Sequence, residues 1–329
     1  MHPVRNRLLS GAIAIVLALA ALPAIRVESV AAATTGNHQA NCSLNVRTKP
    51  STSAPLKASI PANTVVRVSG SVGGGAYSTS CGTTVSGSTW YVVTAIGGRS
   101  TTYLYGIAQL YVASRLVRVA WSPYLEGIDV SSWKSQIDFA RVRAAGRTFV
   151  IAKATEGRYA SDSMYSNHRA GATGAGLAFA AYHFARPDPT PNDAILEADN
   201  FISTARLRHG DLLPVLDIET SGGLGPAALR TWISAWLGRV KSRLGVRAII
   251  YTNAGFWKAS VGDTTAYAVA GYRLWVANWR VSSPSLPANG WGGAGWRVWQ
   301  YDSCGSVPGV SGCVDLDRFN GSDFGAVTY

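Results

Sequence analysis

Carboxylates stand at the ends of apolar segments in the second half of the chain. Residues 212–219 have the sequence LLPVLDIE, which is almost wholly apolar until it closes on Asp217 and Glu219. In a strand, successive side chains alternate between the two faces, so these two acids share a face and lie roughly 6 to 7 Å apart. Crowding in a partly desolvated place raises the pKa of at least one carboxyl group, which keeps it protonated near neutral pH. The pair therefore predicts general acid catalysis, whereas a solvent-exposed strand end would have no function.

Two further segments offer an acid in a similar setting. Residues 127–131 (GIDVS) contain Asp129, and residues 314–319 (VDLDRF) contain Asp315. Because they open and close the region, a barrel that closes on itself would bring their acids to the pair in the middle. Aromatic residues accompany them, and aromatic faces with few charges suit a pyranose ring better than a phosphate. The combination favours a carbohydrate substrate.

The elements that must position these acids alternate between two periodicities. Apolar strand-like runs are separated by helical patterns, which predicts a parallel β/α architecture closed into a barrel with its working residues at the carboxyl ends of the strands. An open doubly wound sheet is the alternative, but no GxGxxG loop follows a strand. The expected strands are Thr148–Lys153, Gly176–Phe184, Leu212–Glu219, Arg247–Asn253, Tyr272–Trp279 and Trp296–Tyr301, and the expected helices are Phe139–Ala145, Asp193–Leu207 and Pro226–Leu244.

Charge divides the chain into two parts. The 329 residues carry 30 Lys and Arg against 18 Asp and Glu, a net charge of +12, which indicates an anionic partner. Residues 38–118 contain seven bases and no acid, so carboxylate chemistry is excluded there. Residues 126–329 contain 17 acids and 20 bases. We expect two domains, 38–118 and 126–329, joined by a linker at 119–125.

The first domain has the pattern of a small all-β barrel. Its β-branched runs are Leu44–Arg47, Thr64–Ser69, Trp90–Ala95 and Gly106–Val112, with Gly70–Gly75 expected to be a loop between them. The segments LNVR (44–47), PST (50–52), IPANTVV (60–66) and WYVV (90–93) resemble a bacterial SH3-type domain. The resemblance implies binding to the cell wall, where a basic domain would be attracted to anionic polymers; a spacer without a ligand is the alternative.

The beginning of the chain indicates export. Arg5 and Arg7 precede an apolar run, residues 8–25, and three alanines follow at 31–33. This pattern predicts a secretory signal peptide over residues 1–33, with an uncleaved membrane anchor as the alternative. An exported protein is expected outside the cell or at the wall, away from nucleic acid and without stable membrane association once the signal is removed.

Export also makes disulfides plausible. Pairing within each half, Cys42 with Cys81 and Cys304 with Cys313, is the simplest of the three connectivities that four cysteines allow. The five histidines lack the spacing of a zinc hydrolase, so we expect neither a metal nor another cofactor.

Six ordered blocks in the second domain resemble the family 25 glycoside hydrolases, the Chalaropsis-type lysozymes. These enzymes cleave the β-1,4 bond after N-acetylmuramic acid in peptidoglycan. The resemblance covers residues 126–329 and implies a flattened (β/α) TIM-like barrel with Asp129, Asp217, Glu219 and Asp315 in one acidic groove. Asp317 departs from the family pattern, in which we expect Asn more often, but Asp315 remains the favoured acid of the last strand. The blocks are GIDVS (127–131), AKATEG (152–157), AYHF (181–184), LDIE (216–219), WVANW (275–279) and VWQY (298–301).

The expected activity is that of a secreted, monomeric muramidase acting on peptidoglycan. Glu219 is the expected general acid, and Asp217 is expected to orient the substrate's own 2-acetamido group as internal nucleophile. Asp129 and Asp315 would keep Glu219 protonated, and Lys153 would either offset charge or pair structurally. The expected sugar contacts are Tyr182, Tyr251, Trp279 and Gln300.

Three other functions fit parts of the pattern. A non-catalytic wall-binding protein would have the same two domains but an incomplete acid cluster. A chitinase-like barrel would need further Asp residues where this chain has Val215 and Leu212. A wall amidase or peptidase would need a zinc or thiol site.

Overall fold

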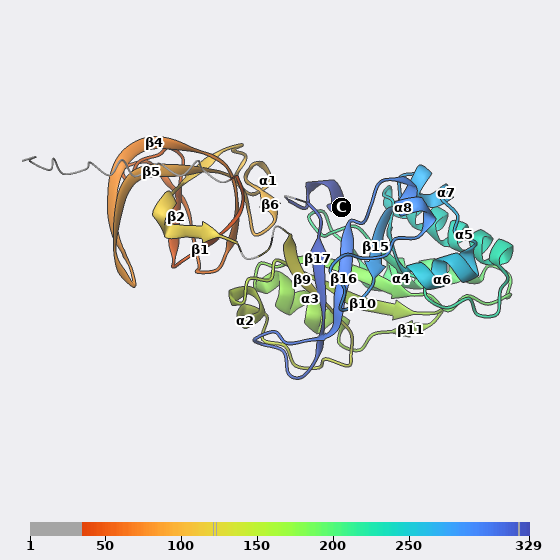
Figure 1. Ribbon diagram of the computed structural model, residues 1–329. Coiled ribbons are helices and arrows are strands. Elements are labelled where there is room, and N and C mark those ends of the chain that lie inside the picture. Colours follow the sequence, from red (N-terminus) through yellow and green to blue (C-terminus); the bar gives the residue numbers. More distant parts are fainter. Residues whose placement is uncertain (1–34, 121, 123, 322) are drawn as a thin grey trace, which may run out of the picture. The chain divides into compact units, whose positions relative to one another are not determined.

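The computed structural model describes residues 35–120, 122, 124–321 and 323–329 (Figure 1). Their strands form two separate sheets. The first sheet's last strand ends at Val119, and the second sheet's first strand begins at Leu125. The expected signal peptide, residues 1–33, lies outside the described residues. Within the described ranges, no helix is long and apolar enough to cross a membrane.

The first sheet is antiparallel throughout, in the order β3-β2-β7-β5-β4-β1-β8, with β6 paired to β5. Its core surrounds Trp90, which packs edge-on against Tyr77 and donates its indole N–H to the carbonyl of Gly75 at 2.8 Å. An SH3-like all-β fold is therefore confirmed. The strands are β1 Gly36–Ala40, β2 Leu44–Arg47, β3 Leu56–Ile60, β4 Val65–Cys81, β5 Thr83–Ile96, β6 Arg99–Ser100, β7 Leu110–Ala113 and β8 Val117–Val119, and one short helix, α1 Thr101–Tyr105, follows β6.

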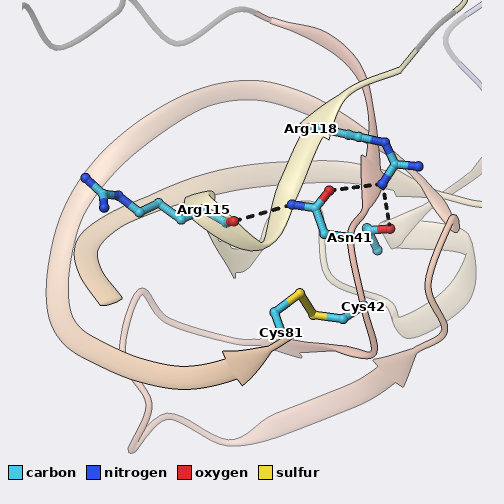
Figure 2. The surroundings of a disulfide bond; sticks show 6 residues. Asn41, Cys42, Cys81, Arg115 and Arg118 are labelled. Carbon is cyan, nitrogen blue, oxygen red and sulfur yellow. Dashed lines mark hydrogen bonds between the residues drawn. A yellow bond between two sulfur atoms is a disulfide. The ribbon is translucent and has the colours of Figure 1, made fainter. Parts of the chain in front are cut away.

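A disulfide joins Cys42, just after β1, to Cys81 at the end of β4, with 5.7 Å between the Cα atoms (Figure 2). Beside it, the Asn41 side chain donates to the carbonyl of Arg115 and accepts from the Arg118 guanidinium at 3.0 Å. The second disulfide joins Cys304 to Cys313. The predicted pairing within each half is confirmed.

The prediction that Gly70–Gly75 forms a loop was wrong, because these residues lie inside the 17-residue strand β4. The strand passes directly over Pro50 and Trp90, and the Gly75 N–H donates to the Pro50 carbonyl at 2.8 Å. Only a residue without a Cβ fits this close approach of two backbones. Gly74 therefore permits packing here rather than marking a turn.

The second sheet closes into an eight-stranded barrel, in the order β9-β10-β12-β13-β14-β15-β16-β17 and back to β9, with β11 as a short hairpin partner of β10. The predicted closed barrel is thus confirmed. One strand differs from an all-parallel barrel, since β17 runs antiparallel to both neighbours. The strands are β9 Leu125–Val130, β10 Phe149–Glu156, β11 Ala160–Ser161, β12 Ala178–Phe184, β13 Val215–Asp217, β14 Ile249–Asn253, β15 Arg273–Ala277, β16 Val298–Gly305 and β17 Val314–Phe319.

Two clusters of buried residues reflect the alternation of side chains along these strands. Ile151, Val215 and Ile249 belong to the cluster that fills the barrel. Their neighbours Val150 and Leu216 belong to the cluster packed against the surrounding helices. The helices are α2 Phe139–Ala144, α3 Tyr165–Gly174, α4 Asp193–Ala205, α5 Pro226–Leu244, α6 Ala254–Phe256, α7 Ala266–Val269 and α8 Ala288–Gly292, and a π-helical turn spans Trp257–Val261.

Element boundaries differ from the predictions for local reasons. The strand expected over Leu212–Glu219 is shorter in the structure: β13 begins at Val215, because Pro214 has no N–H to continue the ladder, and Leu212 forms only an isolated bridge with Thr328. Helix α4 ends two residues early, at Ala205, because Arg206 adopts a left-handed conformation with φ of 43°. Helix α5 spans the predicted Pro226–Leu244, with Pro at its first position and Gly245 as its C-cap.

Because of the close approach at Gly74, the adjacent residues Gly73 and Gly74 should respond differently to replacement by alanine. A Cβ at Gly74 would overlap the Pro50 carbonyl and the Trp90 ring, whereas a Cβ at Gly73 would meet no atom within 4 Å. We expect Gly74→Ala to destabilise the first domain by about 1 to 3 kcal/mol, as overpacking typically does, and Gly73→Ala to have little effect. Urea unfolding of the full chain measures both, and equal effects would contradict the strand packing.

Candidate active site

The inward-facing acids gather where the parallel strands of the barrel end, which we call the carboxyl end of the barrel. Asp129 lies near the end of β9 and Asp217 at the end of β13. Both continue the inward side of their strands, because Leu125 and Val215 on the same face fill the barrel. Each is less than a tenth exposed.

The antiparallel direction of β17 brings two more acids to the same end. Asp315 stands near the start of β17 and pairs in register with Asp129, while Asp317 pairs with Gly127 and Gln300. Both acids are on the inward face with Phe319. The structure thus places both acids of the last strand beside Asp129: Asp317 is completely buried, and Asp315 is partly exposed.

Burial makes ionisation of this cluster costly. Desolvation raises the pKa of Asp129 well above its ordinary value, and the charge of Asp315 raises it further. The pKa of Asp217 is also well above normal, first through burial and then through the charge of Glu219. Burial raises the pKa of Asp315 to about 6. Burial therefore favours the protonated, neutral forms of these groups.

Asp317 is a buried neighbour of Asp129. The Trp275 indole N–H donates to one oxygen of Asp317 at 2.9 Å, and the other oxygen has no hydrogen-bond partner among the described residues. Burial raises the pKa of Asp317 well above its ordinary value, and the charge of Asp129 raises it further. A protonated Asp can donate a hydrogen bond as an Asn amide does, so the raised pKa fits an Asp at a position where Asn was expected.

Gln300 connects the acids to the aromatic residues. Its amide N–H donates to Asp129 at 2.7 Å, and its oxygen accepts from the Tyr251 hydroxyl at 3.0 Å and the Trp279 indole at 2.9 Å. Gln300 and Tyr251 are buried, whereas Trp279 is 48% exposed. Of these three predicted sugar contacts, the structure leaves Trp279 the most accessible. Tyr182 is buried on the inward face of β12, edge-on to Trp275.

Glu219 lies just beyond β13 and is exposed, unlike the other acids of the cluster. Partial desolvation of its carboxyl group raises its pKa, and the positive charges of Arg186 and Lys153 lower it. From the sequence we expected the charges of neighbouring acids to raise the pKa of Glu219 and keep it protonated. In the structure desolvation is the largest cause, and crowding acts on Asp217.

Two cations beside the acids are held by Glu156, at the end of β10. Its carboxylate pairs with Lys153 and accepts from the Arg186 guanidinium at 2.7 Å. Both cations also lie over the ring of Phe184, with Lys153 Nζ 4.9 Å and Arg186 Cζ 4.5 Å from its centroid. Lys153 therefore forms an ion pair with Glu156, and its positive charge also lowers the pKa values of Asp217 and Glu219.

A buried network outside the barrel fixes the loop that carries Arg186. Glu197 on α4 accepts from the Arg186 backbone N–H at 3.1 Å and is hydrogen-bonded to His183 Nε2 at 2.7 Å. His183 Nδ1 is hydrogen-bonded to Thr155 at 2.8 Å, and desolvation lowers the histidine's pKa.

Three residues near the acids were not predicted as site residues from the sequence: Glu156, Arg186 and Asp317. Glu156 lay in the AKATEG block, and Arg186 follows AYHF by two positions.

The acids at this end of the barrel can transfer protons, and the aromatic rings beside them can contact a sugar. In the described part of the chain, no group of three or more His, Cys, Asp or Glu is arranged to hold a metal ion. Comparison with known families agrees with this chemistry. The family model described as "Glycosyl hydrolases family 25" matches residues 128–310, more than half of the chain. The chain belongs to glycosyl hydrolase family 25.

Members and structures of family 25 cover the second domain. The chain is 41% identical over 207 residues to Lysozyme M1 of Streptomyces globisporus, covering 60% of this chain and 68% of that protein. It is 34% identical to an N,O-diacetylmuramidase of Chalaropsis sp, covering 58% of this chain and 96% of that protein. Among solved structures, a lysozyme from Streptomyces coelicolor matches with 38% identity and a TM-score of 0.57, over 62% of this chain and 94% of that one.

The first domain has its own family. The model described as "Bacterial SH3 domain" matches residues 43–116. Both resemblances found in the sequence are therefore confirmed. The chain is a glycoside hydrolase with an N-terminal bacterial SH3 domain.

The raised pKa of Asp315 predicts a pH-dependent stability. An unfolded Asp ionises near pH 4, whereas Asp315 ionises at about pH 6 when folded, so its charge disfavours the folded state above that pH. Asp315→Asn should therefore stabilise the protein at pH 7.5 by on the order of 1 to 3 kcal/mol, with the gain vanishing towards pH 4. Thermal unfolding of both proteins at the two pH values checks this, and an equal effect at both would refute it.

Proposed function

We propose that this chain is a muramidase that hydrolyses the β-1,4 bond between N-acetylmuramic acid and N-acetylglucosamine in peptidoglycan. Membership of glycosyl hydrolase family 25 and the relatives named lysozyme and N,O-diacetylmuramidase support the reaction and the substrate. The observation that carries the proposal is the gathering of Asp129, Asp217, Asp315 and Glu219 at one end of the barrel, where burial raises the pKa of each carboxyl group and the charge of Glu219 raises the pKa of the other three further.

Glu219 is the general acid in this proposal. Its carboxyl group has a raised pKa, and it is the member of the cluster that is open to a substrate. It donates its proton to the glycosidic oxygen as the bond from that oxygen to the anomeric carbon breaks, and the leaving sugar departs as a neutral alcohol. In the second step the resulting carboxylate takes a proton from the attacking water.

Asp217 orients the substrate's 2-acetamido group. Its carboxyl group lies at the end of β13, two residues before Glu219, and in this proposal it accepts the acetamido N–H. The acetamido carbonyl oxygen then bonds to the anomeric carbon as the leaving oxygen departs, and water later breaks that bond. Asp129 sets the position of Gln300 and its aromatic partners by accepting the Gln300 N–H.

The SH3 domain would attach the enzyme to anionic parts of the wall. Its seven bases have no acid within residues 38–118 to neutralise them, and Lys49, Lys57 and Arg115 are exposed. Secretion completes the proposal, because the substrate lies outside the cell and both disulfides are typical of an oxidising compartment. We propose a monomer, without nucleic acid or membrane partners.

Replacement of the general acid tests the reaction. Glu219→Gln keeps the side chain's shape but removes the proton, so the hydrolysis rate should fall at least ~10²-fold with little change in unfolding temperature. The matched control is Asp199→Asn, whose carboxylate pairs with Arg239 on the helices outside the barrel. Mass spectrometry of digested peptidoglycan identifies the products: reducing-end muramic acid supports a muramidase, free peptide an amidase, and no product a binding protein.

Charge replacement tests the wall-binding role of the SH3 domain. The triple change Lys49→Gln, Lys57→Gln and Arg115→Gln should weaken sedimentation with intact walls at low salt, and less so as salt screens the attraction. The control removes the same charge from the second domain at exposed Lys241, Arg243 and Lys258. If both triple variants sediment equally, the SH3 domain has no special part in attachment.

A further inference from the structure

Two aromatic side chains are almost completely exposed to solvent. Trp133 is 90% exposed and Tyr159 is 84% exposed. Tryptophan and tyrosine are buried on average in folded proteins, and rings this exposed contribute almost nothing to the core. Exposed Trp and Tyr residues that serve no packing role are the side chains most often found as anchors in binding sites.

Trp133 lies on the loop that follows the acid-bearing strand β9. It belongs to the turn that follows β9, in which the Lys134 N–H donates to the Ser131 carbonyl at 2.8 Å. This turn leaves the carboxyl end of the barrel directly after Asp129 and Val130. Lys134, next to the tryptophan, is close enough to Asp315 for its charge to lower the pKa of that carboxyl group.

Tyr159 lies at the same end of the barrel, on the turn between β10 and β11. The turn begins directly after Glu156, which holds the two cations near Asp217 and Glu219. The Arg158 guanidinium is 5.7 Å from the centre of the tyrosine ring and pairs with Asp188 at 3.0 Å. Both exposed rings therefore lie on loops that leave the carboxyl end next to the acids.

Hydrogen bonds hold both turns in place. The Ser132 N–H donates to the carboxylate of Asp162 at 2.8 Å, and Asp162 directly follows β11, so the turn of Trp133 is tied to the hairpin of Tyr159. On the other side, the Asn200 amide donates to the carbonyls of Gly157 and Ala160 at 3.0 and 3.1 Å. A ring presented on an anchored backbone loses little entropy when a ligand binds.

We propose that Trp133 and Tyr159 form an accessory platform that binds sugar units of the glycan chain beyond the two units that flank the cleaved bond. The inference rests on the proposed function. The apolar C–H face of an N-acetylated pyranose fits a single exposed ring. Each ring stands alone among polar neighbours such as Ser132 and Arg158, whereas a protein interface would require a contiguous apolar centre.

A platform of this kind favours long glycan strands over short ones. It would add affinity for substrates that reach both the acids and the rings, and leave the protonation chemistry at Glu219 unaltered. Its removal should therefore raise KM for long strands and leave kcat nearly constant, because the lost contacts exist equally in the ground state and the transition state.

The test compares Trp133→Ala, Tyr159→Ala and the double variant with the unmodified full chain. The substrates are peptide-free glycan strands and short muramic acid-containing oligosaccharides, so peptide recognition plays no part. Each single change should lower the ratio of kcat/KM for long over short substrates about 5-fold or more, as for an anchor residue. Trp133→Phe should restore much of the ratio. The control is Val269→Ala on α7, which removes another exposed apolar side chain (81% exposed) and should leave the ratio unchanged.

Binding without hydrolysis separates this inference from the proposed function. In a Glu219→Gln background, loss of both rings should weaken equilibrium binding of the peptide-free strands. If the unmodified chain binds the strands through the rings but releases no muramic acid ends, the muramidase proposal fails and the platform stands. If it hydrolyses walls but ring removal changes neither strand binding nor the ratio, the platform is refuted. An effect confined to peptide-bearing walls, or equal on long and short substrates, also refutes it.

Discussion

The site depends on holding several carboxyl groups together where water is scarce. Asp129, Asp217 and Asp317 face the inside of a closed barrel and are nearly or completely buried, so each would lose much of its hydration if it were ionised. The barrel tolerates them because N–H donors and raised pKa values offset the missing solvent: Gln300 donates to Asp129, Trp275 donates to Asp317, and burial raises the pKa of both acids. Gln300 links these acids to the aromatic residues. Its oxygen can accept from Tyr251 and Trp279 only while its N–H group points at Asp129, so the positions of both rings depend on the buried acid.

The direction of one strand determines which acids take part. In an all-parallel barrel the start of the last strand would lie at the opposite end from Asp129. Because β17 is antiparallel to both β16 and β9, its first residues lie at the carboxyl end, where Asp315 stands across from Asp129. The alternation of side chains then turns Asp317 inward as well. One chain reversal, within the loop closed by the Cys304–Cys313 disulfide, thus contributes two of the cluster's acids.

The local sequence pattern was sufficient to predict much of the barrel and the acids on its strands. A strand that is apolar up to Asp217 already implies an inward acid at its end, and this holds without knowledge of its neighbours. The burial of Asp317 and the pairing of Glu156 with Arg186 depend on strands and loops far apart in sequence, so no local pattern reveals them. The strand through Gly74 is a similar case, because glycine signals a turn unless the partner that approaches it, here Pro50, is known. Family resemblance identified the six sequence blocks but not which of their residues contact one another.

The protonation of the cluster also bears on how an acid-lined site can accept an anionic wall polymer. Counted as fully ionised, the acids would repel carboxylates on the peptide stems of peptidoglycan. Burial raises the pKa values of Asp129 and Asp217, which favours their neutral forms, and Arg186 and Lys153 add positive charge next to Glu219 while Glu156 binds both. The same cations lower the pKa of Glu219, so the positive charge that would help an anionic substrate approach is limited by the need to keep the proposed general acid protonated. In the proposed function a basic SH3 domain avoids this conflict, because its positive charge would attract the wall while the charges that lower the pKa of Glu219 are those of Arg186 and Lys153.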